Sequence, residues 1–194
     1  MSLGDAPSDA VLASRAAGGD ERAFGDLVRR HKEPLYRLLR RYTGDADVAY
    51  EAAHEAFIAA WAAIRRYDSS RPFLAWLRTI AINKARDRGR RMVFRRLLFG
   101  SNSLEESDAL TEPDAAELAD EAVMRRQDMA RLERAIAQLP APLKEALLLT
   151  AFEGLSQQEA GRTLGVTAKT IETRVYRARR ILARTLDPDL KPNA

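Results

Sequence analysis

Residues 155–182 constrain the fold more than any other stretch, because they have the pattern of two short helices separated by a tight turn. Ser156 followed three residues later by Glu159 is the pattern of a capping box at the start of the first helix. Gly165 can end that helix in a left-handed conformation, and Thr167 can cap the second helix. The spacing therefore predicts a helix-turn-helix.

The second of these helices has two distinct faces. Apolar residues recur at three- and four-residue spacing from Ile171 to Leu182, which is the pattern of a stripe buried against the domain. The opposite face is cationic and consists of Lys169, Thr173, Tyr176, Arg177, Arg180 and Arg184. Such a helix can enter the major groove of DNA with its outer face. An ordinary helical hairpin with a solvated basic face is the alternative that this pattern leaves open.

A second basic run lies near the middle of the chain, where Asp87 is the only acid between residues 84 and 96. Trp76, Ile80 and Asn83 lie along the same side of this predicted helix as Asp87, at helical spacing. A run of this kind is either a solvated face or, beside aromatic residues and an exposed loop, a surface that holds melted nucleic acid. The residues alone favour neither interpretation.

The composition then changes sharply, because residues 101–121 contain eight acidic residues and no lysine or arginine. With Pro113 and several serines, this stretch is typical of a flexible linker, and domain boundaries fall in such places. We therefore expect an all-α protein with two small helical domains joined by an acidic linker.

Individual helix boundaries follow from caps and breakers. Asp20 is expected to cap a helix in which Pro34 predicts a kink or break. Gly44-Asp45 marks a turn before a helix over 47–67, and a further long helix begins near Phe73. After the linker, two helices are expected before the helix-turn-helix, over 122–139 and 143–152.

Composition argues against several functional classes. The 194 residues include no cysteine, which excludes a disulfide framework and thiol catalysis, and the formal net charge is +4. The two histidines, His31 and His54, have no metal-ligand spacing, so we expect surface or packing roles and no metal or cofactor. No apolar run approaches the roughly 18 residues of a membrane span, and the first residues lack a secretion-signal pattern. We expect a cytoplasmic, non-enzymatic protein with no small-molecule substrate and no membrane insertion.

The order of these features resembles a known family, the bacterial sigma factors of the extracytoplasmic-function type in the sigma-70 superfamily. The likeness covers about residues 8–186. Three groups of residues carry it: Gly19-Asp20, Ala23-Phe24 and Leu27; Trp76-Leu77, Ile80-Ala81, Asn83, Asp87 and Arg90; and Leu139-Pro140, Phe152-Glu153-Gly154-Leu155-Ser156, Glu159, Leu164-Gly165-Val166, Arg174 and Arg177-Ala178-Arg179.

The resemblance implies sigma region 2 over residues 8–98, an acidic linker over 99–121 that runs through the RNA exit channel, and sigma region 4 over 122–186. It implies a protein that binds core RNA polymerase and directs promoter-specific transcription initiation, as in stress responses. The implied partners are the beta-prime clamp helices and beta flap of the polymerase, promoter DNA, and an anti-sigma factor.

The resemblance also implies three functional surfaces. Contact with the beta-prime clamp helices falls to Glu51, His54, Glu55 and Phe57. The minus-ten element is bound and melted by Arg71, Trp76, Asn83, Lys84, Asp87, Arg90 and Arg91, beside a loop at 67–72 that takes a flipped base. The minus-35 duplex is bound by Lys169, Thr173, Arg174, Tyr176, Arg177 and Arg180.

The chain departs from the family pattern at three places. His54 stands where the family has a glutamine in its polymerase-binding helix. Ala160-Gly161 replaces an isoleucine-alanine pair, and glycine costs a helix about 1 kcal/mol relative to alanine. Ala168-Lys169-Thr170 stands where a glycine-threonine pair is common, so promoter preference does not transfer.

Two other functions remain possible from the sequence. A stand-alone helix-turn-helix regulator needs a dimer interface to read paired half-sites, and the chain has no sustained heptad seam. A helical adaptor that binds only protein would leave the basic face between Lys169 and Arg184 without a use.

Overall fold

The computed structural model describes residues 6–99 and 119–187, and every regular element in these two ranges is helical. The expected all-α fold is therefore confirmed. The described α-helices are α1 Asp9–Ala17, α2 Glu21–Thr43, α3 Ala46–Ala63, α4 Phe73–Phe99, α5 Ala119–Gln138, α6 Ala141–Leu147, α7 Gln157–Leu164 and α8 Ala168–Leu186. A 3-10 turn, η1 (Ile64–Arg66), follows α3, and a π turn, η2 (Leu148–Phe152), follows α6. Within the expected acidic linker, residues 100–118 lie outside the described ranges, and 119–121 already belong to α5.

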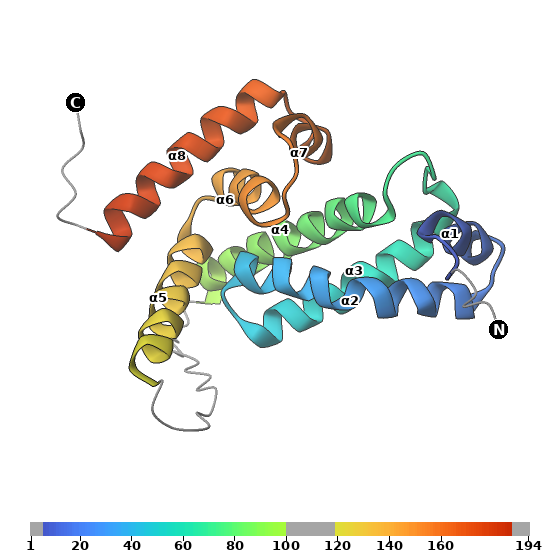
Figure 1. The fold of residues 1–194 in the computed structure, drawn as a ribbon, viewed down its shortest axis with the longest axis horizontal. Coiled ribbons are helices and arrows are strands. Elements are labelled where there is room, and N and C mark those ends of the chain that lie inside the picture. The colour runs from blue at the N-terminus through green and yellow to red at the C-terminus, as the bar shows by residue number, and fades with distance from the viewer. Residues whose placement is uncertain (1–5, 100–118, 188–194) are drawn as a thin grey trace.

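We call α1–α4 the N-terminal module and α5–α8 the C-terminal module. Figure 1 shows α2, α3 and α4 running side by side, with α1 across one end of them. The inward face of α3 is built largely from alanine, and Ala49, Ala56 and Ala60 are fully buried. These small side chains let α2 and α4 pack closely against α3.

The second helix runs without interruption through Pro34, so of the expected kink or break, the break is wrong. Proline removes one helical hydrogen bond and crowds the preceding turn, which costs about 3 kcal/mol in a helix interior. Leu35, Leu38 and Leu39 follow within two turns and are fully buried. Burial of each contributes about 1.5–3 kcal/mol, so tertiary packing keeps α2 continuous.

The helix caps that the sequence predicts are confirmed. The Asp20 side chain accepts a hydrogen bond from the Ala23 amide at the start of α2. Ser156 and Glu159 form the reciprocal capping box of α7. Gly165 ends α7 with a φ of 68°, in the left-handed region, where glycine has no steric penalty.

The two modules pack against each other in the described structure. Ile82 of α4 is 2% exposed and lies in one apolar cluster with Leu149, Ala160 and Ile171 of the C-terminal module. Figure 1 shows α6 lying against α4, with α7 and α8 stacked beyond it. The helix-turn-helix is therefore in direct contact with the helix that carries the central basic run.

Charged side chains also join the modules. Arg86 on α4 donates from Nε and Nη2 to the two carboxylate oxygens of Glu145 on α6, at 3.0 and 2.6 Å. The Tyr42 hydroxyl donates to the same carboxylate at 3.2 Å. The Lys144 ammonium donates to the backbone carbonyls of Tyr42, at 2.9 Å, and of Ala137. We call Tyr42, Arg86, Lys144 and Glu145 the interdomain charge cluster.

Burial changes the acid-base behaviour of this cluster. It raises the pKa of the Tyr42 hydroxyl, and the neighbouring Glu145 charge raises it further. Burial lowers the pKa of Lys144 to about 8, against the attraction of Glu145. Nearby, Arg78 of α4 pairs with Glu153, and the Arg41 guanidinium lies 4.8 Å from the centre of the Phe152 ring. Polar contacts thus extend along most of the contact between the modules.

Candidate nucleic-acid and polymerase interfaces

The helix α8 has the two faces that its sequence predicts. Ile171, Ala178 and Leu182 are buried in the protein. The opposite face is exposed to solvent along Lys169, Thr173, Tyr176, Arg177, Arg180 and Arg184, whereas Arg174 is half-buried. The helix therefore presents a cationic surface on a rigid element, which is the geometry that major-groove binding requires.

Several side chains of this face contact one another. The Lys169 ammonium lies 2.8 Å from a Glu172 carboxylate oxygen, and the Thr173 hydroxyl donates to the Lys169 carbonyl at 3.0 Å. The Arg180 guanidinium lies 5.7 Å from the Tyr176 ring centre, in a cation–π contact. The Glu172 carboxylate shares the face with the cations, so a bound phosphate would compete with it for Lys169.

Gly161 has a packing role in α7 that its low helix propensity did not indicate. A Cβ at this position would lie 2.6 Å from the backbone carbonyl oxygen of Val166. The close approach places the turn and the start of α8 directly against α7. Glycine therefore gives the helix-turn-helix its tight packing, and this gain opposes its lower helix propensity.

On α4, the predicted minus-ten residues lie along the open part of the helix. Asn83, Arg90 and Arg91 are exposed, and Lys84 is half-buried. Asp87 is half-buried and pairs with Arg90. Between residues 73 and 85, the other side of α4 is buried in the apolar clusters of the protein, so this open strip is available to a ligand.

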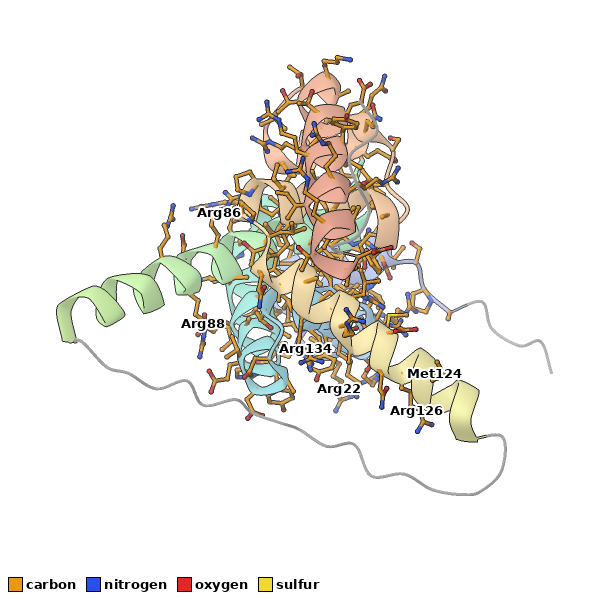
Figure 2. The ribbon with its side chains drawn as sticks, turned by 90° about the vertical axis from the view of Figure 1, so that its left-hand side faces the viewer. Arg22, Arg86, Arg88, Met124, Arg126 and Arg134 are labelled. Atoms are coloured by element: carbon orange, nitrogen blue, oxygen red, sulfur yellow. The ribbon has the colours of Figure 1, made fainter. Side chains whose placement is uncertain are left out.

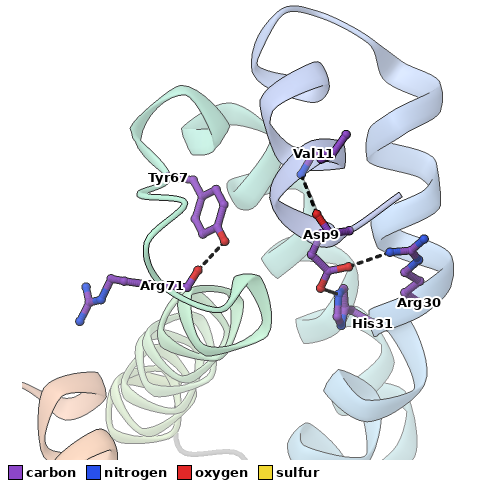
Figure 3. A network of polar contacts seen from close by, with 7 residues as sticks. Asp9, Val11, Arg30, His31, Tyr67 and Arg71 are labelled. Atoms are coloured by element: carbon purple, nitrogen blue, oxygen red, sulfur yellow. Dashed lines mark hydrogen bonds and ion pairs between the residues drawn. The ribbon is translucent and has the colours of Figure 1, made fainter. Parts of the chain in front are cut away.

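The loop between η1 and α4 is held by its own hydrogen bonds. The Tyr67 hydroxyl donates to the Arg71 carbonyl, and the Arg71 amide donates to the Asp68 carbonyl at 3.1 Å. The Ser70 amide donates to the Asp68 carboxylate at 2.9 Å, and hydrogen bonds from Ser70 lower the pKa of that carboxyl. The Arg71 side chain points into solvent from this ordered loop (Figure 3).

Aromatic side chains form the base of this loop. The ring centres of Tyr67 and Trp76 are 5.2 Å apart, and Phe73 lies 5.5 Å from Tyr67 and 5.6 Å from Trp76. Phe73 is buried, whereas Tyr67 and Trp76 are half-buried. Burial raises the pKa of Tyr67, and the charges of Asp9 and Asp68 add to this. Trp76 therefore packs in the core and borders the loop at once.

The structure adds His31 to this cluster, a residue that the sequence placed only as surface or packing. Its ring centre lies 5.4 Å from that of Phe73, and Nε2 lies 2.6 Å from an Asp9 carboxylate oxygen. No local pattern predicts this contact, because Asp9, His31 and Phe73 come from three separate helices.

On the opposite side of the N-terminal module, the predicted polymerase-binding residues border two adjoining grooves between α2 and α3. His54 and Phe57 line both grooves. Phe24, Val28 and Trp61 continue the first groove, and the second is completed by Val28, Lys32, Glu33, Tyr36, Tyr50 and Ala53. Tyr50 is 70% exposed and Ile58 57% exposed. Apolar side chains exposed this strongly and close together are typical of a protein-binding surface.

Glu51 and Glu55 stand beside these grooves, and both pair with Arg88 of α4. All three side chains are accessible to solvent. Figure 2 shows Arg86 and Arg88 on opposite sides of α4, consistent with their partners on α6 and α3. The predicted polymerase-binding acids are thus joined electrostatically to the basic run of α4.

Within residues 6–99 and 119–187, no helix is long and apolar enough to cross a membrane. The same ranges hold no group of three or more histidine, cysteine, aspartate or glutamate side chains that could bind a metal ion.

Comparison with known proteins gives two family matches. The chain matches Sigma-70 region 2 over residues 27–93 and Sigma-70, region 4 over residues 129–182. It is 36% identical over 187 residues to the RNA polymerase sigma factor CnrH of Cupriavidus metallidurans, which covers 94% of this chain and 96% of that protein. It is 31% identical to the ECF RNA polymerase sigma-E factor of Escherichia coli strain K12, covering 93% of this chain and 95% of that protein.

Solved structures agree with these matches. The structure of CnrH in complex with the cytosolic domain of CnrY has a TM-score of 0.68 at 34% identity, covering 94% of this chain and 99% of that one. The sigma factor RpoE of Bartonella quintana, solved with the anti-sigma factor NepR, has the same TM-score at 23% identity, covering 86% and 98%, and shares the fold.

A region 2 module followed by a region 4 helix-turn-helix defines a sigma-70-type transcription initiation factor. The chain belongs to the extracytoplasmic-function (ECF) RNA polymerase sigma factors, which confirms the resemblance seen in the sequence. Its function is that of a sigma factor, which binds core RNA polymerase and directs promoter-specific initiation. The match over residues 27–93 favours this function over a stand-alone helix-turn-helix regulator.

Proposed function

We propose that the two modules divide the promoter between them. Region 2, over residues 8–98, binds core polymerase and the minus-ten element, and region 4, over 122–186, binds the minus-35 element and the beta flap. The observation that carries this division is the presence of one exposed basic face on each module, on α4 and on α8. The chain is a cytoplasmic protein and not an enzyme.

The minus-35 duplex is bound by the outer face of α8. Lys169, Thr173 and Arg177 follow one another at four-residue spacing, so they lie in a row along the groove. Lysine and arginine contact phosphates and the acceptor edge of guanine, while the threonine hydroxyl and methyl contact base edges. Arg174, Tyr176 and Arg180 extend the contact toward the phosphate backbone.

The minus-ten element is opened by α4 and the 67–72 loop. Unpairing a base costs a few kcal/mol, which stacking and hydrogen bonds in a preformed pocket must offset. The ordered loop, with Tyr67 and Trp76 at its base, provides a rigid surface for one flipped base. Asn83, Lys84, Asp87, Arg90 and Arg91 then line the path of the separated strand, and Arg71 contacts its backbone.

Core polymerase docks in the grooves between α2 and α3. A partner helix can insert apolar side chains against Phe57 while Glu51 and Glu55 pair with its basic residues, which is the usual mode of helix-in-groove recognition. His54 sits in both grooves, so it is in contact with whatever occupies them. The clamp helices of the beta-prime subunit are the proposed occupant.

An anti-sigma factor is the proposed inhibitor. The relative CnrH was solved with the cytosolic domain of CnrY, and RpoE of Bartonella quintana with the anti-sigma factor NepR. The exposed apolar grooves of this chain offer such a partner a surface that overlaps the polymerase site. Competition for Phe57 and its neighbours would then block initiation.

The basic faces of α4 and α8 cannot bind one promoter at the same time while the two modules are packed together. The centres of the minus-ten and minus-35 elements are about 25 base pairs apart, or roughly 85 Å at about 3.4 Å per base pair. In the described structure, Ile82 of α4 and Ile171 of α8 belong to one apolar cluster. Binding of one promoter by both modules therefore requires them to separate.

Binding to core polymerase tests the proposed function. Purified chain and bacterial core RNA polymerase are run together on a sizing column, with and without housekeeping sigma factor as competitor. Co-elution that the competitor displaces supports the proposal. Absence of co-elution, together with tight sequence-specific binding of duplex DNA by the chain alone, would favour a stand-alone regulator.

A further inference from the structure

A line of contacts connects the first helix with the loop proposed to take the flipped base. Asp9, the first residue of α1, contacts α2 through both carboxylate oxygens. Oδ1 accepts from Arg30 Nη1 at 3.0 Å, and Oδ2 lies 2.6 Å from His31 Nε2. The His31 ring then packs against Phe73 at 5.4 Å. Figure 3 shows the Asp9 carboxylate joined to both Arg30 and His31 of α2.

Phe73 connects the contact with His31 to the loop. It is 1% exposed and packs against Tyr67, the first residue of the loop, and against Trp76 of α4. The Tyr67 hydroxyl in turn fixes the carbonyl of Arg71. The loop is therefore held from below by three aromatic rings, and His31 packs against the buried one.

The first helix also lies beside the loop, since α1 contacts η1, which ends one residue before it. Asp9 is close enough to Tyr67 for its charge to raise the pKa of that residue. Its side chain is about one-third exposed, and that of His31 is mostly buried. The short, partly buried contact between Asp9 and His31 therefore restricts the motion of α1 relative to α2 more than a solvent-exposed ion pair would.

We propose that Asp9 and His31 are positioning residues that hold Phe73, and through it the 67–72 loop, in the shape that receives an unpaired promoter base. The inference rests on the proposed function of that loop. A pocket that is already ordered loses less conformational freedom when the base enters, so its affinity for the base is higher. Neither residue touches DNA.

The chain offers a matched control, because Arg30 contacts the same carboxylate, and in the described structure no hydrogen bond, ion pair or ring contact joins Arg30 to Phe73 or to the loop. The test variants are Asp9→Ala, His31→Ala and the double variant. Asp9→Asn can still form a hydrogen bond with His31, and Arg30→Ala removes only the other partner of Asp9. Each variant is assembled with core polymerase.

Three affinities are measured for each variant: that of the free chain for core polymerase, and those of its holoenzyme for a minus-35 duplex and for a single-stranded minus-ten segment. Both DNA probes come from a promoter that the wild-type holoenzyme selects from a random library. We expect Asp9→Ala and His31→Ala each to weaken single-strand binding about fivefold. Core and duplex affinities should stay unchanged. The double variant should lose no more than either single variant, Asp9→Asn should recover most of the loss, and Arg30→Ala should bind as wild type.

The outcomes separate a positioning role from a merely structural one. Equal losses in Arg30→Ala and Asp9→Ala, additive losses in the double variant, or unchanged single-strand binding throughout would overturn the proposal. His31→Phe, which keeps a ring against Phe73, replaces His31→Ala if the alanine variant does not fold, and it should lose less affinity than Asp9→Ala. Failure of the wild-type holoenzyme to bind the single strand would instead overturn the proposed function of the loop, and this inference with it.

Discussion

The charged contacts between the modules differ from those on the faces proposed to bind partners. In the contact between modules, the side chains of Glu145 and Glu153 are 2% and 10% exposed. On the outer faces, Glu51 and Glu172 are 58% and 51% exposed although they form ion pairs of the same chemical type. The first group is removed from water and fixed, whereas the second remains hydrated.

This difference determines what each contact can do. Removing one partner of a buried pair leaves an uncompensated charge and costs about 3–5 kcal/mol, whereas an exposed pair contributes about 0–1 kcal/mol. Exposed pairs can therefore exchange partners with DNA or polymerase at little cost. The buried contacts hold the modules together, so separation of the modules must provide Arg86 and Glu145 with water or new partners.

Truncation of Glu145 should have the largest effect. Glu145→Ala leaves the Arg86 guanidinium and the Tyr42 hydroxyl without the carboxylate to which they donate, and we expect the contact between modules to weaken by about 3 kcal/mol. Small-angle X-ray scattering should show a larger radius of gyration, and urea unfolding should lose cooperativity between the modules. Glu145→Gln, which keeps the shape and some hydrogen bonds, should lie between this variant and wild type. An unchanged radius of gyration would show that the apolar cluster around Ile82 is sufficient to hold the modules together.

The pH dependence of stability should report on Lys144. Its pKa in the folded protein is about 8, below the ordinary value of 10.5, so the unfolded chain binds more protons between these values. Stability must then rise with pH across that window. The raised pKa of Tyr42 has the opposite effect above about pH 10. We expect the free energy of unfolding, measured by chemical denaturation, to increase between pH 8 and 10. In the Lys144→Met variant this increase should be absent. A Lys144→Met variant with the wild-type pH profile would contradict this assignment.

Local signals in the sequence predict most of the fold. The capping box at Ser156 and the left-handed turn at Gly165 depend on a few neighbouring residues, so they are visible without a structure. The same holds for the stripe from Ile171 to Leu182, since helical periodicity alone defines it. Continuity of α2 through Pro34 was missed because burial elsewhere outweighs a local rule.

Contacts between distant residues could not be predicted. Arg86 and Glu145 are 59 positions apart and looked like ordinary members of a basic run and an amphipathic helix. His31 carries no motif, and only the folded chain brings it between Asp9 and Phe73. For the candidate interfaces, the sequence located the exposed residues on α4 and α8 but not their ion-pair partners, since these depend on how helices pack.

Substitution on the face of α8 proposed to bind DNA should weaken promoter binding and leave stability unchanged. Arg177 is exposed on α8, so Arg177→Ala should change the free energy of unfolding by less than about 0.5 kcal/mol. Promoter binding by the holoenzyme should weaken, and the slope of log affinity against log salt should decrease by about 1 if the side chain contacts a phosphate. Arg184→Ala on the same face is a control for general charge. An unchanged salt slope would remove Arg177 from the phosphate contacts.

A small effect is expected at Arg88, where the comparison is tested most sharply. Arg88→Ala breaks two ion pairs at once, and because each exposed pair of this kind contributes at most about 1 kcal/mol, the free energy of unfolding measured in urea should fall by no more than about 2 kcal/mol. Glu51 and Glu55 no longer have to leave Arg88 when polymerase docks, and we expect core affinity to rise by up to about fivefold. Arg88→Lys, which restores the charge, should return it toward wild type. A fall in core affinity with unchanged stability would mean that Arg88 itself contacts polymerase. A loss of several kcal/mol in stability would mean that this outer face is as tightly coupled as the buried contact between the modules.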